Sequence, residues 1–133
     1  MKTPCVYFLT NKNRTILYCG VTNNIQVRLH YHYYNWKTKN KKSYTAKYNC
    51  IYLIYTEAHP TMEIAIQREK QLKTFSKSKK WNLILTQNRA LKFLNEKIMN
   101  WPPADEVLAA IIIDPKNGKK KNHPQPSDKN LPV

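Results

Sequence analysis

Two short segments near the start of the chain are rich in β-branched and aromatic residues. They are residues 5–10 (CVYFLT) and 15–20 (TILYCG), and the four residues between them, NKNR, supply turn chemistry. This pattern predicts a β-hairpin. A nearly continuous apolar run at residues 50–56 predicts a third strand.

Helical spacing of apolar residues begins directly after the hairpin. Ile25, Leu29 and Tyr33 follow a possible cap at Thr22 or Asn23, which predicts a helix ending near residue 34. A second helix is expected from Pro60 and Thr61 to about residue 75. A third helix should follow Ser78, and the same pattern continues as far as Ile98. The expected buried residues of the second and third helices are Met62, Ala65, Ile66, Leu72, Trp81, Ile84 and Leu85.

The remaining segments are polar or interrupted by proline. Residues 35–49 are strongly basic and are expected to form a long loop. One domain is expected at residues 1–101, followed at Pro102 and Pro103 by an extension with a short helix at 105–113. Residues 114–133 have the composition of a disordered basic tail. The fold class is therefore α+β, with an extra C-terminal helix.

The charge of the chain points to a polyanionic partner. The 133 residues carry a formal net charge of +15, and no acidic residue precedes Glu57. Basic residues in this acid-free half include Lys37, Lys39, Lys41, Lys42 and Lys47, which are expected to contact nucleic-acid phosphates. Trp36, Tyr44 and Tyr48 among them could stack on unpaired bases or anchor the loop to the sheet. A cationic surface without a nucleic-acid role is the alternative.

Cysteine spacing and hydropathy indicate a cytoplasmic protein. Cys5, Cys19 and Cys50 are odd in number and lack CxxC spacing, which fits a reducing compartment better than a disulfide framework or a zinc ribbon. No apolar run reaches the roughly 18 residues that span a bilayer. No membrane partner and no small-molecule cofactor are expected, and the oligomeric state stays open.

Four side chains near the hairpin could act on a phosphate. Tyr7 and Tyr18 lie on adjacent predicted strands, where a phenol can donate a hydrogen bond or relay a proton. Arg28 and His32 are four apart on one face of the first helix, away from its apolar line. An arginine can hold a phosphate, and a histidine can exchange a proton. The alternatives are half-buried tyrosines with hydrated hydroxyl groups and a solvated helix face; His30 and Tyr31 are assigned to the surface.

Glu69 falls within the apolar stripe of the second predicted helix. A carboxylate there needs a partner, because leaving water costs it free energy. One partner is Lys73, four residues on, and the other is a divalent cation. Periodicity alone leaves both open. Because no second acid is near Glu69 in sequence, any metal is expected to be a single Mg²⁺ or Mn²⁺ with mostly water and phosphate ligands.

The segments CVYFLT and LYCGVTNNIQVRLHYH resemble the paired motifs of the GIY-YIG nuclease superfamily. SYTAKYN, LIYTE and AIQREKQLK resemble later blocks of its small stand-alone bacterial members, so the resemblance covers about residues 4–88. Two positions depart from the motifs, since Cys5 replaces a glycine and Cys19 replaces an isoleucine. The resemblance implies a three-stranded antiparallel sheet flanked by helices.

The resemblance also implies a function, namely metal-dependent hydrolysis of DNA phosphodiesters. Tyr7 would help deprotonate the attacking water, Arg28 and Tyr18 would steady the phosphate, and a metal ion on Glu69 would stabilise the leaving oxygen. Gly20, Thr22, Asn24 and His32 also match. The alternative is a module that keeps the fold and binds DNA or RNA without cutting it.

Overall fold

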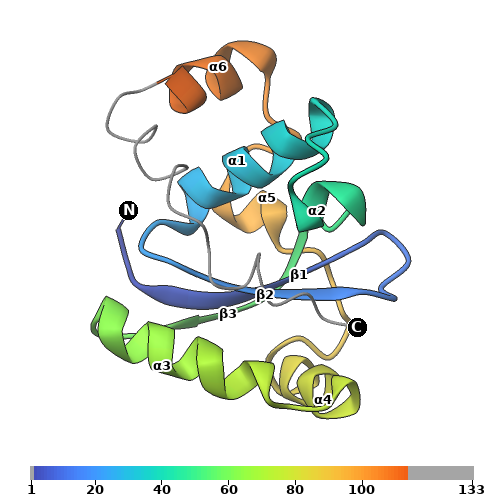
Figure 1. The fold of residues 1–133 in the computed structure, drawn as a ribbon, viewed down its shortest axis with the longest axis vertical. Helices are drawn as coiled ribbons and strands as arrows, with labels where there is room; N and C mark the ends of the chain where they lie inside the picture. The colour runs from blue at the N-terminus through green and yellow to red at the C-terminus, as the bar shows by residue number, and fades with distance from the viewer. Residues whose placement is uncertain (1, 114–133) are drawn as a thin grey trace.

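A three-stranded antiparallel sheet forms the centre of the protein (Figure 1). The structure is a computed structural model and describes residues 2–113; the predicted tail at 114–133 lies outside the described residues. The strands are β1 (Cys5–Thr10), β2 (Leu17–Thr22) and β3 (Tyr52–Ala58), and their order in the sheet is β2-β1-β3. The predicted α+β class with a three-stranded antiparallel sheet is confirmed, with strands β2 and β3 each placed two residues later than expected.

The turn between β1 and β2 is fixed by local hydrogen bonds. The side-chain oxygen of Asn11 accepts hydrogen bonds from the backbone N–H groups of Thr15 and Ile16, at 2.8 and 3.2 Å. Arg14 has a φ of 58°, so the chain reverses through the left-handed region. The turn sets a register in which Tyr7 pairs with Gly20 and Leu9 pairs with Tyr18. Alternation along each strand then sends Tyr7 and Tyr18 to the same face.

Helices cover both faces of the sheet (Figure 1). On one face lie α1 (Ile25–Lys37), α2 (Tyr44–Lys47) and α5 (Asn95–Ile98), and on the other lie α3 (Met62–Lys73) and α4 (Lys77–Gln87). The apolar residues divide accordingly into one cluster with Tyr7, Tyr18 and Leu29 and another with Phe8, Cys19 and Leu72. A sheet buried on both faces explains why all but one of the β1 and β2 residues are buried.

Side-chain caps set where four of these helices begin. Asn24, Ser43, Thr61 and Ser76 each accept a hydrogen bond from a backbone N–H in the first turn of α1, α2, α3 and α4, respectively. The predicted loop at 35–49 is therefore partly helical, because α1 continues to Lys37 and Ser43 starts α2. The short α2 was not predicted, since four residues are too few for a periodic pattern.

The predicted helical pattern beyond Asn88 is mostly wrong. The side chain of Asn88 hydrogen-bonds to the backbone of Ile54 and Lys92, and Leu91 has a φ of 52°, which a right-handed helix excludes. Only α5 is helical in this stretch. Leu85, expected to be buried by α4, is 38% exposed, whereas Ile84 is fully buried.

Amide side chains on either side of this irregular segment, at the end of α4 and the start of α5, cover the outer edge of β3. Asn95 accepts a hydrogen bond from the backbone of Leu53 and donates one to Ile51, and Gln87 makes a similar pair with Thr56. These bonds satisfy strand groups that would otherwise be exposed at a sheet edge.

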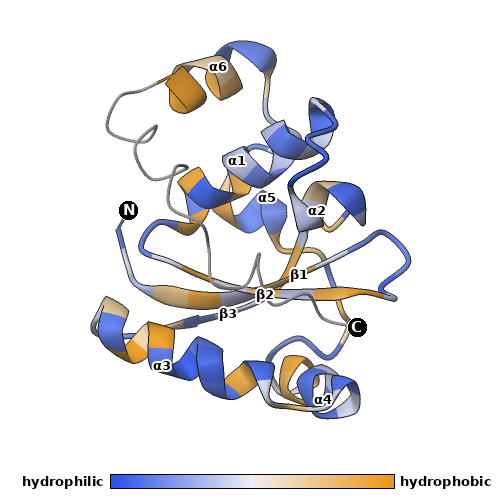
Figure 2. Ribbon diagram, in the orientation of Figure 1, coloured by the Kyte–Doolittle hydropathy of each residue, from blue (hydrophilic) through white to orange (hydrophobic). Residues whose placement is uncertain are grey.

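The predicted short helix at 105–113 is present as α6 (Asp105–Ile113). Figure 2 shows its apolar second half. Leu108 and Ile112 pack against Tyr31 of α1, which draws α6 onto the helical layer of that face. Within residues 2–113, no helix has the length and hydropathy needed to cross a membrane.

Candidate active site

Tyr7 and Tyr18 meet beneath α1, on the sheet face that carries the first helix. Their ring centroids are 6.3 Å apart, and both side chains are buried. The pairing of Tyr7 with Gly20 places Tyr18, two residues before Gly20, diagonally across the ladder. The two phenols are therefore buried core residues, which excludes the half-buried alternative with hydrated hydroxyl groups.

Gly20 makes room for the hydroxyl end of Tyr7. A Cβ atom at Gly20 would lie 2.4 Å from Cζ and 2.5 Å from Oη of Tyr7, closer than real Cβ atoms approach other atoms. Glycine is thus required for a close approach, although its backbone is not in the left-handed region. The glycine of the second motif fixes the position of the tyrosine of the first.

His32 hydrogen-bonds to Tyr7. The Nε2 atom of His32 is 2.8 Å from the Tyr7 hydroxyl, and its Nδ1 atom is 2.9 Å from the hydroxyl of Thr45. Burial, and then the positive charge of Arg28, lower the pKa of His32 well below its ordinary value of 6.5. The imidazole is therefore neutral near pH 7, with one nitrogen able to donate and the other able to accept. The Tyr7 hydroxyl donates to Nε2 when the ring proton is on Nδ1 and donated to Thr45.

Arg28 belongs to the same group of side chains. It stands one helical turn before His32 on α1, and its charge acts on the His32 ring. The structure thus brings four predicted residues together, Tyr7, Tyr18, Arg28 and His32, with His32 buried rather than on a solvated helix face. His30 and Tyr31 were assigned to the surface, and that assignment is wrong: both are buried, His30 by folding back onto Gln26 of its own helix and Tyr31 beneath α6.

Two further residues belong to this group: Thr45, which was not predicted, and Tyr44, which was predicted only to stack on bases or to anchor the loop. Thr45 is buried on α2 and orients His32, and Tyr44 stacks on Tyr18 with ring centroids 6.0 Å apart. Both lie in the segment SYTAKYN, where Ser43 caps α2 and its hydroxyl is 3.1 Å from that of Thr45. The serine cap followed by an aromatic residue was the available sequence signal. Tyr44 anchors the segment to the sheet, as one of its two alternative readings expected.

Glu69 is buried on α3, on the other side of β2. Its carboxylate Oε2 is 3.4 Å from Nζ of Lys73, so the contact expected by the ion-pair alternative exists. Burial, and then the charge of Glu69, raise the pKa of the Cys19 thiol to about 12, and α3, which carries Glu69, packs against β2, which carries Cys19. Because Cys19 and Tyr18 point to opposite faces of β2, Glu69 and the tyrosines flank the same edge strand from two sides.

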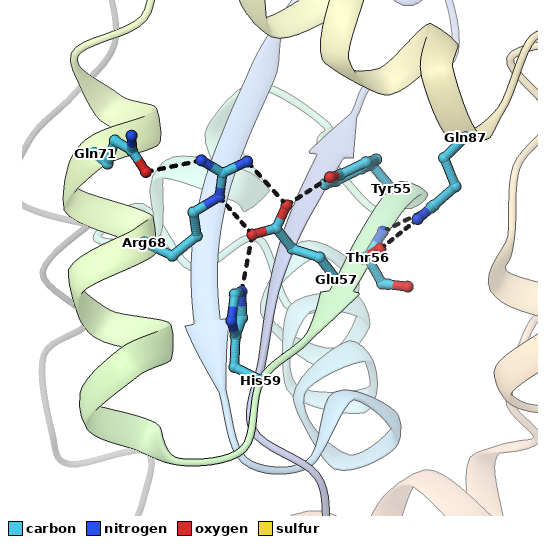
Figure 3. A network of polar contacts seen from close by, with 7 residues as sticks. All are labelled: Tyr55, Thr56, Glu57, His59, Arg68, Gln71 and Gln87. Atoms are coloured by element: carbon cyan, nitrogen blue, oxygen red, sulfur yellow. Dashed lines mark hydrogen bonds and ion pairs between the residues drawn. The ribbon is translucent and has the colours of Figure 1, made fainter.

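A polar network on β3 fixes the orientation of α3 (Figure 3). Glu57 accepts hydrogen bonds from Arg68 Nε at 2.7 Å, from His59 at 2.8 Å and from the Tyr55 hydroxyl at 2.5 Å. Burial raises the pKa of Glu57, but hydrogen bonds from Arg68, Tyr55 and His59 outweigh burial and hold the pKa below its ordinary value. Since Arg68 precedes Glu69, this network holds the helix at the rotation that turns Glu69 toward the sheet. Glu57 belongs to β3, one residue beyond the strand predicted at residues 50–56.

The five predicted phosphate-binding lysines gather around the end of α1 and α2. All are exposed, and Lys37, Lys39, Lys41 and Lys47 line one cleft. Lys37 also forms an ion pair with Asp105 at the start of α6, at 2.5 Å. The charge of Lys37 is therefore partly neutralised by Asp105, a contact that the sequence analysis did not predict.

The donor chemistry around Glu69 fits a single hard divalent ion. Among the described residues, no group of three or more His, Cys, Asp or Glu side chains could hold a metal by itself. A lone carboxylate suits Mg²⁺ or Mn²⁺, which keep several waters as ligands. The Lys73 ammonium lies 3.4 Å from this carboxylate, so a metal ion there would replace an existing cationic partner.

Comparison with protein-family models places this geometry in a known class. The model described as the GIY-YIG catalytic domain matches residues 3–82, and the chain therefore belongs to the GIY-YIG superfamily. This is a family of nucleases that act on nucleic acid. No curated protein and no solved structure matched the chain.

Proposed function

We propose that this protein is a metal-dependent endonuclease that hydrolyses DNA phosphodiester bonds. The observation that carries the proposal is the 2.8 Å hydrogen bond between the Tyr7 hydroxyl and a neutral, buried His32, beside Tyr18 and Arg28. A phenol backed by a proton acceptor is suited to general-base chemistry.

The hydrogen-bonded chain gives the proton of the attacking water a route. The water oxygen forms a bond to phosphorus while its proton passes to the Tyr7 oxygen and the Tyr7 proton passes to Nε2 of His32. The phosphorus–oxygen bond to the leaving nucleotide breaks, and the departing oxygen collects a proton from solvent. Thr45 keeps Nε2 available as the acceptor, because it occupies Nδ1.

Arg28 and Tyr18 hold the phosphate during this displacement. The guanidinium offers a planar fork of donors to two phosphate oxygens, and the Tyr18 hydroxyl donates to one of them. In a site shielded from water, these donors stabilise the charge that develops on the phosphate.

Glu69 is the proposed ligand of one Mg²⁺ or Mn²⁺. When bound, the ion supplies positive charge for the phosphate and the leaving oxygen. Lys73 now lies 3.4 Å from this carboxylate, so its ammonium would have to move away for the ion to bind.

The test of the activity is a substrate panel. Labelled linear, branched and single-stranded DNA, together with RNA, are incubated with the purified protein in Mg²⁺, Mn²⁺ or EDTA. We expect DNA cleavage that EDTA abolishes. Absence of cleavage on every substrate would reject the nuclease proposal.

The role of Glu69 is tested with Glu69→Gln, which keeps its size and removes its charge. We expect this variant to bind DNA but to lose Mg²⁺-dependent cleavage and the Mn²⁺-induced rise in melting temperature. Lys73→Met is the matched control, because it removes only the ion pair and should keep both. Cleavage by Glu69→Gln at the wild-type rate would reject the metal role.

A binding module without cleavage is the second candidate. The observation that favours it is the complete burial of Glu69 against Lys73, which leaves the carboxylate already neutralised. This candidate predicts tight, salt-dependent binding of nucleic acid, no cleavage, and a similar loss of stability for Glu69→Gln and Lys73→Met.

A further inference from the structure

A cleft of about 880 Å³ opens between the end of α1 and α2, next to the candidate active site. Its aromatic lining is Tyr33 and Trp36, and its cationic lining is Lys37, Lys39, Lys41 and Lys47. The volume is within the range of about 300–1,000 Å³ that small-molecule-sized ligands occupy. The cleft therefore has room for a nucleotide-sized group.

The aromatic wall of the cleft is held in place. The indole Nε1 of Trp36 donates a hydrogen bond to the side chain of Asn49 at 2.8 Å, and the Trp36 ring packs against Tyr33 at 5.6 Å between centroids. Tyr33 is in turn supported edge-on by Trp101, at 5.1 Å. Both Tyr33 and Trp36 are half-buried, so each ring is backed by protein and also borders the cleft. A fixed ring face costs little entropy when a flat ligand stacks on it.

The rim of the cleft complements phosphate. Four lysine side chains surround the aromatic wall, and residues 1–56 contain no acid. A flat hydrophobic face ringed by ammonium groups matches a nucleobase flanked by its own phosphodiesters. An acidic peptide would satisfy the lysines but offers no regular planar group to the indole. A base inside a duplex is also excluded, because its faces are covered by neighbouring pairs.

The helix α2 connects the cleft to the reactive tyrosines. Ala46 and Lys47 border the cleft, while Tyr44 and Thr45 contact Tyr18 and His32. The helix has four residues and is thus about 6 Å long. Its length is close to the spacing of adjacent phosphates in an extended strand. A strand whose base lies in the cleft would therefore pass along α2 toward the side of the tyrosines.

We propose that this cleft binds one unpaired nucleotide of a nucleic-acid strand by stacking its base on Trp36 and holding its phosphates with the surrounding lysines. The inference rests on the proposed function only in that the bound strand is the nuclease substrate. Its consequence is a preference for nucleic acid that carries an unpaired base close to the scissile bond, over an uninterrupted duplex.

The experiment measures binding in EDTA, so cleavage plays no part in it. The probes are a blunt DNA duplex and the same duplex with one bulged 2-aminopurine, a fluorescent adenine analogue, and a matched pair in RNA. We expect the bulged probe to bind about 5- to 100-fold more tightly and its emission to be quenched on binding, as stacking on an aromatic side chain implies. The DNA and RNA arms show which backbone is preferred.

Trp36→Leu should abolish both the preference and the quenching while leaving salt-dependent duplex binding. Tyr34→Leu is the matched control, because Tyr34 is an exposed aromatic on the same helix that does not line the cleft, and it should behave as wild type. If Trp36→Leu does not fold, quenching of the 2-aminopurine emission by the wild-type protein still tests whether the base stacks in the cleft. Equal binding of the two probes, unquenched emission, or equal competition by polyglutamate would overturn the inference, whether or not the protein cuts DNA.

Discussion

His32 is a buried base that the fold keeps uncharged. Its nitrogens bond to Tyr7 and Thr45, and burial together with Arg28 lowers its pKa. In the unfolded chain the same histidine titrates near 6.5. Below that pH the unfolded chain takes up a proton that the folded protein resists, so stability must fall with acidification.

We therefore predict a loss of stability as the pH falls below 6.5 that depends on His32. The contribution is complete above the unfolded pKa of 6.5 and disappears as the pH falls toward the lower folded pKa. Melting temperatures of the wild type and His32→Gln, measured across this range, should converge at low pH. Parallel curves would show that His32 is not held neutral. The carboxyl of Glu57 does not confuse the result, because its pKa is held below 4.5.

Gly20 and Tyr7 should be energetically coupled. Gly20→Ala puts a Cβ within 2.4 Å of the Tyr7 ring, so the ring must move, at a cost of about 1–3 kcal/mol. The same change in a Tyr7→Leu background should cost nothing, because leucine lacks the atoms in conflict. Urea unfolding of the wild type, the two single variants and the double variant gives the coupling free energy between the two positions. Additive effects would contradict the close contact.

At this scale the sequence predicted which candidate side chains lie together but not the residues that support them. The paired motifs identified Tyr7, Tyr18, Arg28 and His32, and these residues lie together as expected. The sequence could not predict that Thr45 contacts His32, because the residues between them show no periodic pattern that would bring the two together. For Glu69, periodicity predicted burial but could not decide between a metal and Lys73.

The helix α3 is held to the sheet by the network around Glu57 as well as by its apolar face. Arg68 is the member of that network on α3, and it also bonds to Gln71. The exposed fractions of the Arg68 and Glu57 side chains are 26% and 16%, so solvent screens the pair only partly. Removing Arg68 should therefore loosen the orientation of Glu69.

We predict that Arg68→Met costs about 1–3 kcal/mol in the free energy of unfolding, the range for hydrogen bonds to charged groups. Lys70→Met is the control, because Lys70 is exposed on the same helix and loses the same charge. The pKa of Glu57 is lowered in the folded state, so the Arg68 contribution should be present above pH 4.5 and fade as the pH falls further. Equal effects of the two variants at neutral pH would argue against the network.

At the scale of elements, capped and periodic segments were predicted and irregular ones were not. Local sequence signals, namely turn residues, caps and apolar spacing, were enough to predict the hairpin, α1, α3, α4 and α6. The segment 88–94 has helical spacing but is held open by Asn88 and its bonds to β3. Tertiary hydrogen bonds there override the local pattern. The spacing of apolar residues carries no information about such long-range bonds, so it could not predict the irregular structure.

Across the whole molecule, the two halves of the candidate site lie on opposite sides of one sheet. The tyrosines lie on the sheet face covered by α1, which carries His32, and Glu69 is buried on α3 at the other face. Tyr18 and Cys19 of β2, an edge strand in the order β2-β1-β3, point to these two opposite sides. A substrate phosphate would have to reach both halves from the β2 edge. The basic cleft at α2 adjoins the first half, so under our proposal a bound strand would run from α2 toward β2.

The ion pair between Lys37 and Asp105 should reduce the affinity of this basic surface for nucleic acid. Asp105 lies on α6 and bonds to Lys37 at 2.5 Å, which raises the pKa of the lysine. Both side chains are exposed, so a phosphate can compete for the ammonium, but only by displacing the carboxylate. Lys37 is therefore expected to count for less in binding than Lys41, which lines the same cleft.

We predict that Asp105→Asn increases the affinity for nucleic acid and steepens the slope of log affinity against log salt by up to about 0.9, the equivalent of one added phosphate contact. In the wild type, Lys37→Gln should change that slope less than Lys41→Gln, and in the Asp105→Asn background the two changes should be equal. Glu106→Gln is the matched control, because it removes the same charge from the next exposed residue of α6. If Glu106→Gln has the same effect as Asp105→Asn, net charge alone governs binding. A larger effect at Asp105 would instead show that binding depends on release of the Lys37 ammonium at the mouth of the cleft.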